Sequence, residues 1–136
     1  MTIALQYCNI TVNDVDESIA FYGDALGLQV RNDVPSGGFR WVTLGSDAQP
    51  GLEIVLSVPH AGRSQADGDA LQELLTKGVL PMTVFRSDDV DATFETVRAS
   101  GAEVLQEPID QSWGPRDCAF RDPSGNVVRI AQAPAA

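Results

Sequence analysis

The sequence predicts an α+β domain made of two copies of a βαβββ module. The first observation is an internal repeat, in which the segment 7–30 has a diverged copy at 82–104. Each copy contains a short apolar strand, an Asp-Val-Asp step, an amphipathic helix, a glycine and another strand. The second observation is the spacing, since Asp14 and Asp89 are 89 − 14 = 75 residues apart. A repeat of whole elements at one period indicates a duplicated module.

The first module is expected to begin with a strand over residues 3–12, which alternates weakly and ends at Asn13-Asp14. Asp14 is predicted to cap a helix, because Glu17 follows it at the spacing of a capping box. Apolar residues at i, i+4, i+7 and i+11 place one face of this helix against the core: Val15, Ile19, Tyr22 and Leu26. Gly27 is expected to end the helix.

Three more strands complete the first module. They are expected at residues 28–34, 39–44 and 52–58. A turn at 35–38 separates the first two, and a polar loop containing Pro and Gly at 46–51 separates the last two. The module as a whole covers about residues 3–60.

A linker over about residues 61–78 contains a short predicted helix at 69–77. The second module, at about 79–133, then repeats the plan of the first. Its helix is capped by Asp89, ends at Gly101, and buries Val90, Phe94 and Val97. Its strands are expected at 79–86, 102–106, 116–120 and 126–132, with a tight Asp122-Pro123-Ser124-Gly125 turn between the last two.

Four strands and one helix cannot cover both faces of a sheet. The helix of each module therefore protects one face, and the other face is expected to form a curved, inward-looking cleft. Residues on that uncovered face are the first candidates for a functional site.

Composition restricts the function classes. A chain of 136 residues with 43% hydrophobic and 21% charged residues is typical of one globular domain. The formal charge of −10 argues against a nucleic acid partner. No apolar run approaches the roughly 20 residues that cross a bilayer, and the first residues do not resemble a signal peptide, so we expect a cytoplasmic protein with no membrane partner. Cys8 and Cys118 are expected to be reduced core thiols.

Three stretches carry a resemblance to a known family. They are ITVNDVDESIAFYGDALGL, RWVTLGSDAQPGLEIVL and FRDPSGNVVRI, at residues 10–28, 40–56 and 120–130. They resemble the vicinal oxygen chelate (VOC) superfamily, the glyoxalase, bleomycin resistance and dioxygenase group, and the last resembles its Asp-Pro-x-Gly-Asn hairpin. The resemblance implies two βαβββ modules that form an eight-stranded curved sheet around a cleft, often completed by a homodimer.

Enzymes of this superfamily usually hold a divalent metal in the cleft. The resemblance places the four ligand positions at Tyr7, Glu53, Met82 and Arg129. Only Glu53 is a typical ligand, because Met82 is a poor ligand for such metals and Arg129 is permanently positive. Tyr7 would bind a metal only as phenolate, and the single histidine, His60, is expected to be solvated in the linker. We therefore predict no metal and no cofactor.

The resemblance then implies metal-independent binding of a small organic molecule, as in the members that sequester drugs. Aromatic side chains of such members stack on flat ligands. Trp41 is either such a residue or part of the core, and Trp113 is a candidate lid. The predicted ligand-binding residues are Tyr7, Trp41, Glu53, Met82, Trp113 and Arg129.

A glyoxalase-like lyase or isomerase is the alternative function, and whether the protein is an enzyme stays open. Without a metal, Glu53 would be the catalytic base and Arg129 would stabilise charge. With a metal, other ligands would be needed. Glu53 and Arg129 are also candidates for an ion pair that replaces the metal, with or without a role in binding. Three further arginines are expected to pair with surface carboxylates: Arg40, Arg116 and Arg121. The alternative for Arg116 is to line the rim of the pocket together with Asp117.

Overall fold

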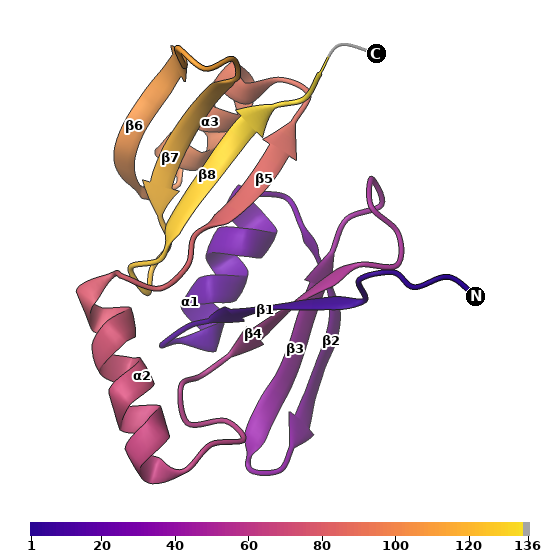
Figure 1. Cartoon of the computed structure of the whole chain (residues 1–136), viewed down its shortest axis with the longest axis vertical. Helices are drawn as coiled ribbons and strands as arrows, with labels where there is room; N and C mark the ends of the chain where they lie inside the picture. The colour runs from indigo at the N-terminus through magenta and orange to yellow at the C-terminus, as the bar shows by residue number, and fades with distance from the viewer. Residues whose placement is uncertain (135–136) are drawn as a thin grey trace. The chain divides into compact units, whose positions relative to one another are not determined.

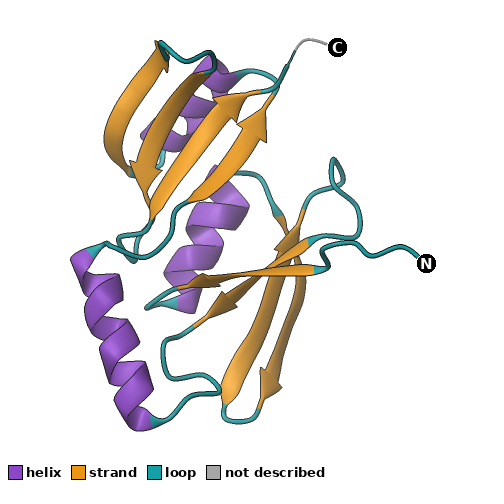
Figure 2. Cartoon of the chain, in the orientation of Figure 1, coloured by secondary structure: helices purple, strands orange, loops and turns teal. Residues whose placement is uncertain are grey.

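A computed structural model describes residues 1–134 and contains two four-stranded sheets with helices (Figure 1 and Figure 2). The chain divides into two compact units, Met1–Glu73 and the residues from Leu74 onward. The strand order is β1-β4-β3-β2 in the first unit and β5-β8-β7-β6 in the second. Each sheet has one parallel pair, β1 with β4 or β5 with β8, and two antiparallel pairs. The predicted α+β class with two βαβββ modules is confirmed.

The elements follow the predicted order. The first unit contains β1 (Tyr7–Thr11), α1 (Val15–Ile19), the π-helical turn η1 (Ala20–Ala25), β2 (Gln29–Ser36), β3 (Phe39–Gly45) and β4 (Glu53–Ser57). Helix α2 (Gln65–Lys77) spans the division between the units. The second unit contains β5 (Thr83–Ser87), α3 (Val90–Ala99), β6 (Glu103–Asp110), β7 (Arg116–Arg121) and β8 (Val127–Gln132).

The first helix begins as predicted but changes its winding after one turn. The carboxylate of Asp14 accepts a hydrogen bond from the Glu17 backbone N–H at 2.9 Å, so the cap is confirmed. From Ala20 the helix is π-helical, with the Leu26 N–H donating to the Phe21 carbonyl. The extra residue per turn rotates the buried face. The structure buries Ser18, Phe21 and Tyr22, whereas the predicted Val15, Ile19 and Leu26 are only half-buried.

Helix α3 matches its prediction closely. Asp89 accepts a hydrogen bond from the Ala92 N–H at 3.0 Å, and Val90, Phe94 and Val97 are at most 4% exposed. Figure 2 shows this helix lying along one face of the β5-β8-β7-β6 sheet. Beyond its end, the backbone turns through Gly101 at φ +92°, a conformation that favours glycine.

Helix α2 is longer than predicted. It begins at Gln65, where residue 69 was expected, because the Ser64 hydroxyl accepts a hydrogen bond from the Asp67 N–H at 3.1 Å and caps the helix. His60 is not freely solvated, since its Nε2 lies 2.8 Å from the Asp69 carboxylate. The His60 ring packs directly on Gly68, where an added Cβ would lie 2.1 Å from the ring.

Gly68→Ala is expected to reveal this packing in a double-mutant cycle. In a His60→Ala background, the substitution should raise the free energy of unfolding by about 1 kcal/mol, because alanine is the better helix former. With His60 present, the gain should be smaller, because the new methyl group forces the ring away from Asp69. Urea denaturation of the four proteins measures both gains. Equal gains in the two backgrounds would show that a methyl group at residue 68 does not disturb the packing of the His60 ring.

The turn between β7 and β8 is organised by a buried carboxylate. Asp122 is 4% exposed, and its Oδ1 accepts hydrogen bonds from the Ser124 and Asn126 backbone N–H groups, each at 2.9 Å. Its Oδ2 accepts a hydrogen bond from Asn126 Nδ2 at 3.0 Å. Gly125 completes the turn at φ +98° and donates its N–H to the Asp122 carbonyl. The predicted Asp-Pro-Ser-Gly turn is confirmed.

Strand alternation gives each sheet a buried face and a more open one. The buried apolar residues of β3, β4, β7 and β8 include Val42, Leu44, Leu56, Cys118, Phe120, Val128 and Ile130. The expectation for the cysteines is correct for one residue only. Both are unpaired, but Cys8 is exposed, whereas Cys118 is buried and burial raises its thiol pKa to about 11.

The three surface arginines pair with carboxylates, as predicted. Arg40 contacts Asp33 at 2.8 Å and Asp16 at 2.9 Å. Arg116 contacts Asp91 at 2.7 Å and Asp110 at 3.4 Å, and Arg121 lies 3.4 Å from Glu103. Because all these groups are substantially exposed, the pairs orient side chains more than they stabilise the fold.

Candidate functional site

The open face of the first sheet carries three of the predicted site residues. Tyr7 on β1 pairs in register with Glu53 on β4, so their side chains lie on the same face. Trp41 and Thr43 on β3 share this face, since they alternate with the buried Val42 and Leu44. The alternation of the strands and the order β1-β4-β3-β2 therefore place these four side chains together.

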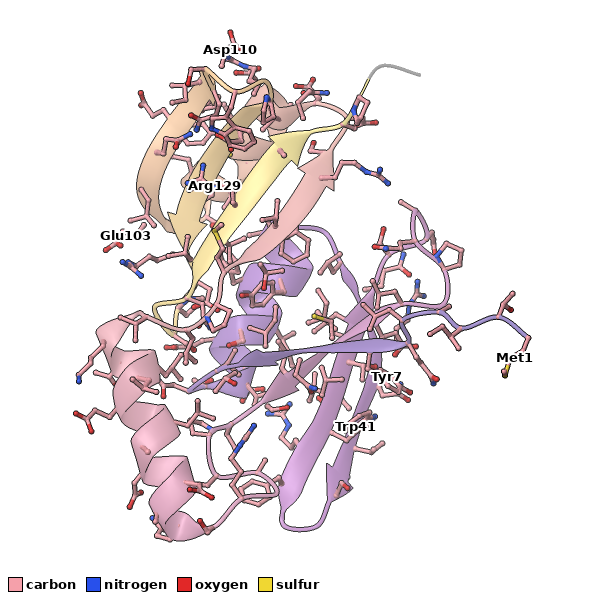
Figure 3. All side chains as sticks on the ribbon, in the orientation of Figure 1. Met1, Tyr7, Trp41, Glu103, Asp110 and Arg129 are labelled. Atoms are coloured by element: carbon pink, nitrogen blue, oxygen red, sulfur yellow. The ribbon has the colours of Figure 1, made fainter. Side chains whose placement is uncertain are left out.

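An aromatic pair crosses this face. The rings of Tyr7 and Trp41 meet edge to face, with centroids 5.5 Å apart and planes at 84° (Figure 3). Because β4 lies between their strands, the two rings reach toward each other over β4, where Val55 is 2% exposed. Tyr7 and Phe39 are each 39% exposed, and Trp41 is half-buried. The pair thus covers part of the core and still offers aromatic surface to a ligand.

A polar cluster lies beside the aromatic pair. Glu53 Oε1 accepts hydrogen bonds from the Thr43 hydroxyl at 2.5 Å and from Asn32 Nδ2 at 3.4 Å. Asn32 also donates to the Thr43 hydroxyl at 2.9 Å, and Thr43 is fully buried. These neutral donors hold one carboxylate oxygen in place. The other oxygen, Oε2, forms no hydrogen bond or ion pair with the residues that the structure describes.

The open face of the second sheet contains a buried ion pair. Asp117 on β7 is 1% exposed, and its carboxylate lies 3.1 Å from Nη1 of Arg129 on β8. Figure 3 labels Arg129 on this sheet. Gln106 and Gln111 donate to the same carboxylate at 2.9 and 2.8 Å. Burial alone would raise the pKa of Asp117, but hydrogen bonds from Gln111, Gln106 and Arg129 outweigh it and hold the pKa below its usual range.

The remaining predicted residues lie near the open face or in a turn. Met82 directly precedes β5, alternates with Val84 and is 55% exposed. Trp113 is 73% exposed in the turn between β6 and β7, which the Gln111 N–H closes by donating to the Pro115 carbonyl. Neither residue is part of the buried core.

The six predicted residues therefore form separate groups: Tyr7, Trp41 and Glu53 in the first unit, and Met82, Trp113 and Arg129 in the second. Glu53 and Arg129 each have partners in their own unit, and an ion pair between them stays a prediction. The sequence prediction missed the supporting residues Asn32, Thr43, Gln106 and Gln111. The signal for Thr43 was its alternation with two apolar residues in the segment Trp41–Leu44.

Comparison with protein-family models identifies the superfamily. The model described as Glyoxalase/Bleomycin resistance protein/Dioxygenase superfamily matches residues 4–130. The chain belongs to this superfamily. The resemblance inferred from the three sequence stretches is thereby confirmed.

Known members and structures are similar over nearly the whole chain. The structure of UcmS2 has a TM-score of 0.86 and 32% identity, covering 98% of this chain and 100% of its own. The structure of TnmS3, an antibiotic binding protein from Streptomyces sp. CB03234, has a TM-score of 0.76 and 25% identity, with coverage of 98% and 99%. The lactoylglutathione lyase of Haemophilus influenzae is 32% identical over 127 residues, which are 90% of this chain and 87% of its own.

The four side chains that the sequence resemblance assigns to the metal-ligand positions do not fit a divalent metal. The first sheet supplies one carboxylate and one phenol, from Glu53 and Tyr7. The second supplies the thioether of Met82 and the guanidinium of Arg129, which is already paired with Asp117. Among residues 1–134, no three His, Cys, Asp or Glu side chains are grouped as a metal site. None of the helices in this part of the chain is long and apolar enough to cross a membrane.

Proposed function

We propose that this protein binds a small, flat organic molecule on the open face of its first sheet, without a metal, and so sequesters it. The observation that carries the proposal is the partly exposed pair of Tyr7 and Trp41 beside the Glu53 cluster. Ligand sites commonly combine aromatic walls with a few placed polar groups. The similarity to TnmS3, an antibiotic binding protein, supports the same class of function. The proposal includes a homodimer, which is the form that the superfamily resemblance implies.

Stacking on this face is energetically plausible because its rings are already positioned. The edge-to-face contact restrains Tyr7 and Trp41 before a ligand arrives, so little side-chain entropy is lost on binding. A flat ligand would bury exposed aromatic surface, while the Glu53 carboxylate would offer an acceptor. Apolar area supplies affinity in such a site, and the polar group fixes orientation.

Trp41→Leu is expected to weaken the binding of a flat tricycle such as fluorene by about fivefold, because aromatic stacking contributes about 1 kcal/mol beyond apolar burial. Trp41→Phe should retain most of the affinity. Leu74→Ala removes an exposed apolar side chain from α2 and serves as the control. Isothermal titration calorimetry, with and without EDTA, measures the affinities. Equal affinity of wild type and Trp41→Leu, or loss of binding with EDTA, would contradict the proposal.

A lyase or isomerase remains the second candidate function. Two observations favour it: the similarity to the Haemophilus influenzae lactoylglutathione lyase, and a Glu53 carboxylate oriented by Thr43. In a metal-free enzyme, Glu53→Gln would abolish turnover while binding persists. An assay with the hemithioacetal of methylglyoxal and glutathione separates the candidates, since sequestration predicts no turnover.

A further inference from the structure

We propose that the ligand of the first sheet is a flat aromatic compound that carries an alkylammonium group, and that Glu53 is the residue that selects it. This inference rests on the proposed function and names the chemical class of its ligand. It begins from the Glu53 carboxylate, with which no cation of the described residues forms an ion pair. Its partners are the neutral Thr43 hydroxyl and the neutral Asn32 amide.

Two basic groups, Arg31 and Arg129, are candidates to pair with this carboxylate, and both have other partners. Arg31 lies over Gly45, the register partner of Glu53, since an added Cβ there would sit 3.1 Å from Arg31 Nε. Its Nη2, however, contacts Asp47 at 2.9 Å. Arg129 is paired with Asp117 in the second unit. Among the described residues, Oε2 of Glu53 therefore has no hydrogen-bond or ion-pair partner, and no cation contacts the carboxylate.

The neighbouring rings favour the same kind of ligand. Tyr7 lies opposite Glu53 in register, and Trp41 contacts Tyr7. Aromatic faces attract cations through their quadrupoles, and a nearby carboxylate adds a charge-assisted hydrogen bond. An ammonium group attached to a flat ring system would use the rings and Oε2 together. An anion would be repelled, both by Glu53 and by a chain of formal charge −10.

Three compounds on one tricyclic skeleton test the inference: fluorene, aminofluorene with the amine on the saturated carbon, and fluorene carboxylate. Wild-type protein is expected to bind the amine about tenfold more tightly than fluorene, and fluorene more tightly than the carboxylate. Glu53→Gln should lower the affinity for the amine to that for fluorene. Glu53→Asp keeps the charge and should retain a preference for the amine.

The arms of the experiment distinguish this inference from the proposed function. Equal binding of all three compounds that depends on Trp41 would support the proposed function and overturn the inference. Preference for the carboxylate would also overturn it, and binding of none would overturn both. If Glu53→Gln does not fold, the salt dependence of binding to the wild-type protein tests the inference. The preference for the amine should then decline from low to high ionic strength, and a constant preference would overturn the inference.

Discussion

Asp122→Ala is expected to lower the free energy of unfolding by about 3 kcal/mol, because it removes the acceptor of three hydrogen bonds in a buried turn. The donors left behind include the backbone N–H groups of Ser124 and Asn126, which are at most 7% exposed as residues. In the structure, no buried side-chain nitrogen or oxygen of residues 1–134 lacks a partner. The substitution would therefore leave the Asn126 amide and two backbone donors unsatisfied.

Two other variants make the Asp122 prediction specific. Asp122→Asn keeps an oxygen for the two backbone donors but opposes one amide nitrogen to another at Asn126, so its cost should be intermediate. Asp14→Ala removes a single exposed cap and should cost about 1 kcal/mol. Urea denaturation of the three variants gives the order of their free energies of unfolding. If Asp122→Ala costs no more than Asp14→Ala, the turn does not depend on its buried carboxylate.

Asp117→Asn is expected to cost about 3 kcal/mol at neutral pH, because it breaks a buried ion pair and leaves Arg129 without its counter-charge. The amides of Gln106 and Gln111 also lose a charged acceptor. Asp110→Asn is the matched control, since Asp110 is an exposed partner of Arg116 and its loss should change stability little. Chemical denaturation at pH 7 measures both.

The pH dependence of the Asp117 effect has a definite sign. The folded pKa lies below the usual value of 3.8, so the unfolded chain binds a proton more readily than the folded chain. The stabilisation is therefore complete above about pH 4 and is lost as the pH falls through the folded pKa. Asparagine does not titrate, so the difference between wild type and Asp117→Asn should shrink below pH 4. A difference that stays constant would show that the ion pair contributes nothing.

Short sequence motifs predicted the helix caps and the turn between β7 and β8 well. Asp14 and Asp89 were recognisable as caps because each precedes an apolar period, and Asp122 belonged to a turn with its own residue chemistry. These features depend on neighbours within four positions along the chain. The π-helical turn at Ala20–Ala25 was not predictable in this way, because packing on the sheet decides which face of the helix is buried.

The candidate site was predicted only in part, for a related reason. Periodicity and the family resemblance named Tyr7, Trp41 and Glu53 as candidates, but the contact between Tyr7 and Trp41 depends on β4 lying between β1 and β3. The ion pair between Asp117 and Arg129 could not be predicted either. It joins β7 and β8, and the sequence alone does not give the register of these two strands. Cross-strand neighbours require topology, whereas caps and turns do not.

The parallel strand pairs also determine the order in which a nascent chain can fold. Tyr7 pairs with Glu53, 53 − 7 = 46 residues later, and Thr83 pairs with Val128, 128 − 83 = 45 residues later. On the ribosome, β1 therefore has no partner until β4 has been synthesised, and closing such a loop costs chain entropy. All four strands of the first sheet exist once Ser57 has emerged. The first sheet can thus form before β8, the partner of β5, has been synthesised. Translation therefore separates the assembly of two similar modules in time, which reduces mispairing of strands between them.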